Sequence, residues 1–325
     1  MEQKTLEVRN LTVCFRTDRG NVLPVNGVSL DVPAGSIVGI VGESGCGKSM
    51  TARAVMGLLR YPGKVTGGSV FLCGRDITAL PDRERRRLRG SEVSMIFQEP
   101  MTSLNPVIRV GKQVEEAILL HTDCTREEAK ARTLEMFREV EIPEPEARYG
   151  WYPHQLSGGL RQRVMIAMAM VCRPSLLIAD EPTTALDVTV EAQILALLER
   201  LRKAGTSVLL ISHNLGVIAR VCDYVYVMYA GRIVEQAETQ ALFAGPAHPY
   251  TRGLFRSVTS LRNGSETLET IPGVVPNLLR LPAGCSFSLR CAECTENCGK
   301  NVPELLEIRP GHKVRCFPAQ KEAAE

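Results

Sequence analysis

The sequence has almost no excess of either charge. Lysine and arginine number 39 against 36 aspartates and glutamates, which gives a formal net charge of +3 at pH 7. So small an excess argues against bulk attraction to nucleic acid or to an anionic membrane surface. Aromatic residues are also few, at 5% of the chain with a single tryptophan, so the stacking platforms usual in single-strand binding are not evident. Any polyanion must be held by a local site.

Long apolar runs are missing as well. The longest, VMIAMAMVC at residues 164–172, has about half the length that a helix needs to cross a bilayer. The N-terminus, MEQKTLEVRN, has no basic stretch followed by an apolar core and therefore does not predict a signal peptide. We expect a chain that stays in the cytoplasm and does not itself span a membrane.

Apolar residues are nevertheless sufficient for a large core. The 325 residues are 44% hydrophobic and 23% charged, which is typical of a globular chain with one large domain or two modest ones. Cysteine is unevenly distributed: six of the eleven are scattered through the first 284 residues, and five lie between Cys285 and Cys316. Disulfides are not expected in a reducing compartment, so this cluster indicates a separate device.

Strand patterns dominate the first part of the chain. LEVRNLTVCF alternates apolar and polar residues, and the turn TDRGN separates it from VSLDV, which indicates an antiparallel edge region. SIVGIVG is a buried, β-branched run of the kind found in parallel sheets, and a glycine-rich turn and a helical pattern follow it. VSMIF, SLLIAD, SVLLISH and YVYVMYAG also have strand length. Three of them end at polar residues, where a parallel sheet presents its carboxyl edge.

Two further regions depart from the strand pattern. Between about residues 100 and 173 the apolar residues follow helical periodicity, which predicts a helical subdomain inserted in an α/β core. After about Ser260 the chain is rich in glycine and proline, which marks a boundary. The expected division is therefore a large domain at residues 1–260 and a small cysteine-rich extension at 261–325.

The stretch GESGCGKS, residues 42–49, matches G-x-x-x-x-G-K-[ST] between a buried strand and a helix. This is the context in which the motif forms a phosphate-binding loop. Glycines let backbone N–H groups turn toward phosphate oxygens, and the helix N-terminus adds a favourable dipole. Lys48 is predicted to reach the β- and γ-phosphates of ATP, and Ser49 to offer its hydroxyl to Mg²⁺.

The stretch SLLIADEP, residues 175–182, is an apolar strand that ends in two carboxylates. Adjacent acids repel unless one has a cation and the other has a different task. Asp180 is predicted to support the Mg²⁺ shell, and Glu181 to polarise the attacking water. The alternative is that these residues form a solvated acidic turn. The presence of the phosphate loop makes this interpretation less favoured.

The stretch LSGGLRQR, residues 156–163, resembles the signature sequence of the ATP-binding-cassette (ABC) ATPases, which other phosphate-loop enzymes lack. Gln98 in MIFQEP resembles the Q-loop glutamine of this family, Asp187 at the end of TALD its D-loop, and His213 in LLISHN its switch histidine. The resemblance spans about residues 5–260. It implies an α/β P-loop NTPase with a RecA-like core, an antiparallel β edge region and an inserted helical subdomain.

The resemblance also implies a head-to-tail dimer in which the signature of one cassette caps the ATP on the phosphate loop of the other. Phe15 is a candidate for stacking on adenine, although the family more often has tyrosine there and a plain strand position is the alternative. Leu160 stands where many members have glutamine, a tolerated variation. The predicted nucleotide contacts are Phe15, Gly42, Glu43, Ser44, Gly45, Cys46, Gly47, Lys48, Ser49, Met50, Ser157, Gly158, Gly159 and Asp187. The predicted catalytic residues are Lys48, Gln98, Glu181 and His213, and the predicted Mg²⁺ ligands are Ser49, Gln98 and Asp180.

More specific stretches resemble the ATPase subunits of bacterial dipeptide, oligopeptide and nickel importers. These are EPMTSLNP after the Q-loop, HPYT at residues 248–251, IPGVVPNL at 271–278 and the cysteine region. In such importers an extracytoplasmic binding protein delivers solute to two membrane permease subunits, and the ATPases lie on the cytoplasmic face of the inner membrane. The resemblance implies peptide cargo, with nickel or a nickel chelate as the rival, and a paralogous ATPase as partner. Glu99 and Met101–Asn105 are the candidates for contact with the permease.

A soluble ABC ATPase that acts on nucleic acid or ribosomes is the alternative from another class. The single cassette and the long helical insert favour a transporter. The basic run RERRRLRG, residues 83–90, lacks the wider basic surface and the aromatic platforms of a nucleic-acid site. It is predicted to be a solvated helix face, and no nucleic-acid partner is expected.

The cysteines of the extension follow the spacing C-x5-C-x2-C-x3-C-x17-C. Reduced packing cysteines, disulfides and a structural zinc are the simpler interpretations. Residues 291–298 have a polar context that does not suit packing cysteines, disulfides conflict with the compartment, and zinc stays open. Peptide-importer ATPases of the type that this chain resembles carry a motif matching Cys285, Cys291, Cys298 and Cys316, and some bind a [4Fe–4S] cluster, which also requires four thiolates. Cys294 departs from that motif.

Overall fold

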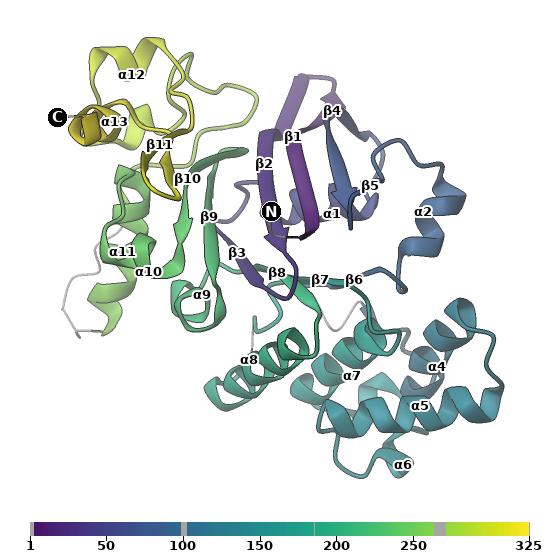
Figure 1. Ribbon diagram of the computed structural model, residues 1–325. Coiled ribbons are helices and arrows are strands. Elements are labelled where there is room, and N and C mark those ends of the chain that lie inside the picture. The colour runs from purple at the N-terminus through teal and green to yellow at the C-terminus, as the bar shows by residue number, and fades with distance from the viewer. Residues whose placement is uncertain (1–2, 99–102, 185, 263–270, 325) are drawn as a thin grey trace. The chain divides into compact units, whose positions relative to one another are not determined.

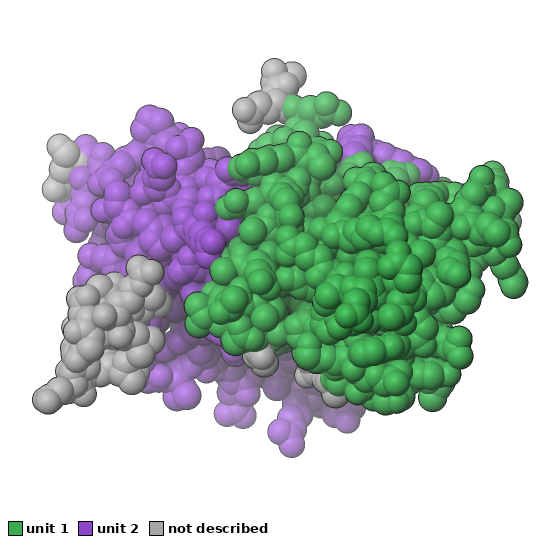
Figure 2. All heavy atoms as spheres, turned by 90° about the horizontal axis from the view of Figure 1, so that it is seen from below, with its two compact units in different colours: residues 1–5, 32–36, 79–210 green, residues 6–31, 37–78, 211–325 purple. Residues whose placement is uncertain are grey.

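The computed structural model describes residues 3–98, 103–184, 186–262 and 271–324, without the side chains of 258–262. The chain forms two compact units, coloured separately in Figure 2, and each is assembled from several segments. Unit 1 comprises residues 1–5, 32–36 and 79–210, and unit 2 comprises residues 6–31, 37–78 and 211–325.

Parallel strands form the centre of unit 1. Strands β8 (Ser207–Ile211), β7 (Leu176–Asp180) and β6 (Val93–Ile96) lie in this order, and β6 pairs with β7 in parallel. Every residue of these three strands is buried, which explains why their sequences are nearly continuous apolar runs. The strands predicted from VSMIF, SLLIAD and SVLLISH are therefore present.

Helices occupy the stretch between β6 and β7, as predicted (Figure 1). They are α4 (Val110–His121), α5 (Arg126–Glu139), α6 (Pro145–Arg148), the short η1 (Pro153–Gln155) and α7 (Gly158–Met170). Helix α5 begins with a capping box, because the Thr125 hydroxyl accepts from the Glu128 amide and the Glu128 carboxylate accepts from the Thr125 amide. Helix α7 holds residues 164–170 of the longest apolar run. Of the whole run, only Met168 and Cys172 are not fully buried.

Two further helices lie in the described part of unit 1. Helix α8 (Val188–Lys203) follows β7, and α2 (Asp82–Leu88) precedes β6. Helix α2 contains residues 83–88 of the basic run, and all residues of the helix except Leu88 are exposed or half-buried. The predicted solvated helix face is therefore confirmed.

Unit 2 contains two groups of strands. In the first, β2 (Gly20–Pro33), β1 (Lys4–Thr17), β4 (Gly63–Leu72) and β5 (Arg75–Asp76) are neighbours in that order, and β4 pairs antiparallel with both β1 and β5. The predicted antiparallel edge region is this sheet. In the second, β3 (Ile37–Val41) pairs in parallel with β9 (Tyr224–Tyr229), and β9 pairs antiparallel with β10 (Arg232–Glu238).

The C-terminal extension continues this second sheet. Strand β12 (His312–Val314) pairs antiparallel with β10, and β11 (Leu306–Arg309) pairs antiparallel with β12. The helical segments of the extension are η2 (Ser288–Arg290), α12 (Glu296–Lys300) and α13 (Phe317–Ala324). Its own core is small and consists of Val314, Cys316 and Ala319.

The remaining helices of unit 2 are α1 (Lys48–Met56), α9 (Leu215–Val221), α10 (Thr239–Ala244) and α11 (Pro249–Arg262). Helix α11 runs two residues past the predicted boundary at 260.

Candidate functional site

The phosphate loop, residues 42–49, joins β3 to α1 in unit 2, as the motif predicts. Gly47 caps helix α1 with a φ of 112°, and Gly42 has a φ of 153°. A Cβ at Gly47 would lie 2.1 Å from the carbonyl oxygen of Pro24, and one at Gly42 would lie 2.2 Å from that of Met228. Neither approach is compatible with a side chain, so both positions require glycine.

Lys48 is the first residue of α1, and its side chain folds over the loop. Its Nζ donates to the carbonyl oxygens of Gly42, at 2.7 Å, and Glu43, at 3.2 Å. The residue is buried, so this cation lies within the loop and is held there by backbone oxygens. Ser44 and Gly45 are exposed, and Ser49 and Met50 are half-buried.

The acidic strand end lies in unit 1. Strand β7 ends at Asp180, which is 2% exposed, and the next residue, Glu181, has a positive φ of 50°. The Glu181 carboxylate accepts from Gln98 Nε2 at 3.2 Å and from Thr184 Oγ1 at 2.9 Å. The structure therefore brings together two residues that are 83 positions apart, because β6 and β7 are parallel neighbours and both side chains follow the carboxyl ends of these strands.

The signature residues and Asp187 lie at two helix N-termini of unit 1. Ser157 caps α7, and its hydroxyl accepts from the Leu160 amide at 3.3 Å. Asp187 caps α8, and its carboxylate accepts from the Val190 amide at 2.9 Å. Ser157, Gly158 and Asp187 are exposed. The two N-termini are close, because a Cβ at Gly159 would lie 3.1 Å from Val190.

His213 and Phe15 lie in unit 2. His213 is two residues beyond the end of β8 and is exposed. Phe15 is a half-buried residue of β1 that pairs with Gly63 on β4, and its ring covers that glycine. Of the predicted permease contacts, Glu99, Met101 and Thr102 lie outside the described residues, whereas Leu104 is buried and Asn105 is exposed.

The four cysteines predicted as a metal set converge in the extension. Cys285, Cys291, Cys298 and Cys316 all line one small cavity, and Cys294 is exposed and does not line it. All eleven cysteines are free thiols. Burial raises the pKa of Cys285 and of Cys291 and raises that of Cys316 to about 12. Among the described residues, no three His, Cys, Asp or Glu side chains are close enough to hold one metal ion, so the predicted metal site is not supported as it stands.

Comparison with known proteins identifies the family of this chain. Residues 25–184 match the family described as ABC transporter, and residues 234–298 match the C-terminal region of oligopeptide/dipeptide transporters. The oligopeptide transport ATP-binding protein of Salmonella typhimurium is 51% identical over 318 residues, which cover 98% of this chain and 94% of that protein. The one of Escherichia coli is 50% identical with the same coverage. The chain belongs to the ABC transporter ATP-binding proteins.

Two solved structures agree with this assignment. A dimeric bacterial ABC transporter cassette has a TM-score of 0.66 and 28% identity, and the match covers 72% of this chain and 98% of that one. A dimeric post-hydrolysis state of an ATP-binding cassette bound to ADP and phosphate has the same TM-score and coverage, with 27% identity. The predicted P-loop NTPase fold is therefore confirmed, and the protein is an ATPase of the ABC family. Within the described part of the chain, no helix has the length and apolar character to cross a bilayer.

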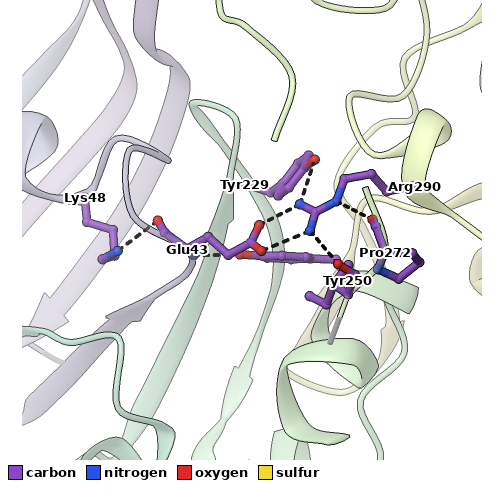
Figure 3. A network of polar contacts seen from close by, with 7 residues as sticks. Glu43, Lys48, Tyr229, Tyr250, Pro272 and Arg290 are labelled. Carbon is purple, nitrogen blue, oxygen red and sulfur yellow. Dashed lines mark hydrogen bonds and ion pairs between the residues drawn. The ribbon is translucent and has the colours of Figure 1, made fainter. Parts of the chain in front are cut away.

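Two residues at this ABC ATPase's phosphate loop were not predicted. The Glu43 amide donates to Tyr250 Oη at 2.8 Å, and the Glu43 carboxylate forms an ion pair with Arg290 (Figure 3). Tyr250 belongs to HPYT, a stretch whose chemistry the sequence does not reveal. The only signal at Arg290 is its place in the cysteine region, one position before Cys291.

Proposed function

We propose that this ABC ATPase is the ATP-hydrolysing subunit of an importer that takes up dipeptides or oligopeptides. The observation that carries the proposal is similarity along nearly the whole chain to oligopeptide transport ATP-binding proteins, with a match in the C-terminal region that a cassette alone does not contain. The proposed division is an ATPase domain at residues 1–260, with its helical subdomain at about 100–173, and an extension at 261–325.

In unit 2 the phosphate loop is proposed to bind the phosphates of ATP. Its glycines leave room for the close approach of phosphate oxygens, and α1 directs its N-terminus at the loop. Lys48 now bonds to loop carbonyls and is placed to exchange them for the β- and γ-phosphates. Phe15 is proposed to stack on adenine, and His213, exposed after β8, to contact the γ-phosphate and water.

In unit 1 Glu181 is proposed to be the general base. Its hydrogen bonds from Gln98 and Thr184 hold the carboxylate in one orientation, so that it accepts a proton from the attacking water without reorganising. Ser49, Gln98 and Asp180 would hold Mg²⁺, and their hydroxyl, amide and carboxylate oxygens are the donors this ion prefers. When bound, Mg²⁺ neutralises charge on the phosphates.

The exposed signature is proposed to act on a second subunit's nucleotide. Ser157 and Gly158 are exposed at the N-terminus of the 13-residue helix α7, which suits an anion contributed by another chain. We propose a paralogous ATPase as that partner, with Asp187 beside the interface. Two membrane permease subunits and a binding protein complete the importer, and this chain would lie peripherally on the cytoplasmic face of the inner membrane.

The cysteine cavity is proposed to hold a [4Fe–4S] cluster. Such a cluster takes one thiolate on each of four irons, so it does not need three thiols around a single ion, which the described residues do not provide. Zinc does need that arrangement and is therefore the weaker alternative. Cys285, Cys291, Cys298 and Cys316 would be the ligands, because they line the cavity and Cys294 does not.

The importer proposal is tested by uptake in cells that lack the gene for this chain. Uptake of a radiolabelled tripeptide should be lost and should return with the wild-type chain but not with Glu181→Gln, while nickel uptake stays unchanged. Loss of nickel uptake alone would show that nickel, and not peptide, is the cargo. No change in the uptake of either would reject the importer role.

The cluster proposal is tested on chain purified without oxygen. About four iron and four sulfide per chain are expected, and Cys298→Ser should lower both whereas Cys294→Ser should not. Zinc in place of iron, or equal effects of the two substitutions, would reject the proposed ligand set.

A further inference from the structure

Arg290 is a buried cation at the phosphate loop that comes from the C-terminal extension. It is the last residue of η2, between Cys285 and Cys291, and only 4% of its side chain is exposed. Its Nε donates to the carbonyl oxygen of Pro272 at 2.9 Å (Figure 3). A terminal nitrogen donates to the carbonyl oxygen of Ile271 at 3.2 Å. Backbone carbonyls of the extension therefore fix the position of the Arg290 side chain.

The open end of the guanidinium is directed at Glu43, the second residue of the phosphate loop. The two terminal nitrogens donate to the two carboxylate oxygens of Glu43, at 2.7 and 3.1 Å. A bidentate pair of this kind fixes the direction as well as the distance. The hydrogen bonds to Glu43 outweigh burial and raise the pKa of Arg290, so the residue is charged at every physiological pH.

An acid at this position is unfavourable for the task of the loop. Residues 42–49 must receive a polyanion, and the Glu43 side chain, 26% exposed, adds a negative charge to the same loop. Like charges a few ångströms apart near a protein surface repel each other. A positive charge that is fixed against Glu43 removes this repulsion and leaves Lys48 as the net charge of the loop.

Glu43 is also held through its backbone. Its amide donates to Tyr250 Oη at 2.8 Å, and its carbonyl oxygen accepts from Lys48 Nζ at 3.2 Å. The Arg290 bond at the side chain adds a third fixed point to one residue. Arg290, 247 positions from Glu43 in the sequence, thus helps to set the conformation of the loop.

We infer that Arg290 is a positioning residue of the nucleotide site, which the C-terminal extension supplies to neutralise and orient Glu43, and that the affinity for ATP depends on it. This inference rests on the proposal that residues 42–49 bind the phosphates of ATP. It gives the extension a role in the chemistry of the cassette that the peptide-importer assignment does not contain.

The test is a charge cycle in the full-length chain, with dissociation constants for the non-hydrolysable analogue AMP-PNP and Mg²⁺ measured by calorimetry. Arg290→Gln should raise the dissociation constant about tenfold because Glu43 is left uncompensated. Glu43→Gln should lower it severalfold because Arg290 is left in excess. The double variant should return to within about threefold of wild type. The Arg290→Gln effect should also shrink at high salt.

Several outcomes would overturn the inference. If Arg290 only anchors the extension, the double variant binds AMP-PNP as weakly as Arg290→Gln, because both lack the ion pair. If Arg290→Gln does not fold, Glu43→Gln still decides, since unchanged or weaker binding contradicts the charge argument. Arg252→Gln is the matched control, because it breaks an ion pair with Glu293 of the extension and not with a residue of the loop, and it should leave binding unchanged.

Lys48→Ala separates this inference from the proposed site. It should abolish AMP-PNP binding whatever Arg290 does, because it removes the cation of the loop. Retained binding in Lys48→Ala would reject the site itself, whereas lost binding together with an unaffected Arg290→Gln would reject only the role of Arg290.

Discussion

The two halves of the catalytic machinery are built by different means. In unit 1 the acidic strand end depends on side chains, since Gln98 and Thr184 orient the Glu181 carboxylate and Ser157 and Asp187 cap helices. In unit 2 the phosphate loop depends on backbone conformation, since Gly42 and Gly47 adopt positive φ against neighbouring carbonyls. The contacts described for the first half all come from residues within its own motifs. The second is supported by Tyr250 and Arg290, more than 200 positions away.

This difference indicates where each half is vulnerable. Changes at the acidic strand end should alter turnover and leave nucleotide affinity in place, because the oriented carboxylate acts on water. Changes at the phosphate loop or behind it should alter affinity or stability, because they shift the backbone that receives the phosphates.

The largest effect is expected from Glu181→Gln. It preserves the shape of the side chain and removes the proton acceptor, so kcat should fall by on the order of 10²–10⁴-fold with little change in ATP affinity. Steady-state ATPase rates and calorimetric binding measure the two separately. Glu135→Gln, an exposed acid on α5, is the control and should retain activity. A parallel loss of affinity in Glu181→Gln would contradict the division between the halves.

Gly47→Ala should reverse that pattern. Its Cβ would lie 2.1 Å from the Pro24 oxygen and 2.6 Å from Met228 Cε, so the loop must shift and ATP affinity should fall on the order of 100-fold. Gly45→Ala is the matched control, because Gly45 also has a positive φ but meets nothing within 4 Å. Gly45→Ala should lower the free energy of unfolding only by the strain of a left-handed backbone conformation, about 1–2 kcal/mol. Equal affinities in the two variants would show that crowding is not what selects glycine at 47.

The stability of the region around Tyr250, which supports the phosphate loop, should decrease at low pH because of His248. Burial lowers the pKa of this histidine to about 4 from 6.5, although the Glu235 charge opposes the shift. Between these values the unfolded chain binds a proton that the folded chain does not, so the free energy of unfolding should decrease as the pH falls from 6.5 to 4. The loss is about 3 kcal/mol at most.

His248→Asn should flatten this dependence in denaturant titrations across pH 4–7. The asparagine oxygen replaces Nδ1 as the acceptor for the Tyr250 amide, a bond of 3.0 Å in the structure, without taking up a proton. His154→Asn, at an exposed histidine, should leave the slope as it is. An unchanged slope in His248→Asn would mean that another group carries the acid sensitivity.

The smallest effect is expected from Tyr250→Phe. It removes the acceptor of the Glu43 amide, so the free energy of unfolding should fall by about 1 kcal/mol. Tyr61→Phe, at a tyrosine that is 92% exposed, provides the baseline in the same denaturation experiment. If Tyr250→Phe matches this baseline, the hydroxyl contributes nothing to the loop.

The predicted parts of the fold and site share one property, which is that their signals are local. The phosphate loop, the strand before it and the acid-bearing β7 each lie within about ten consecutive residues, so pattern and chemistry are visible together. Tyr250 and Arg290 carry no such signal, because their partner Glu43 is 207 and 247 positions away and only the folded chain brings them to it. The roles given to Phe15 and His213 stay predictions for a different reason, because their proposed partners are a nucleotide and a water molecule and not residues of the chain.

The hairpin β11–β12 has a consequence for any shortened form of this chain. Strand β12 covers the outer edge of β10 with backbone hydrogen bonds. A protein cut after the ATPase domain, by proteolysis or by a premature stop, would leave the donors and acceptors of that edge unpaired. Bare edges recruit other strands, so such a fragment should self-associate and precipitate. Loss of the extension would then be recognised in cells first as an aggregation defect, before any deficit in nucleotide turnover became measurable.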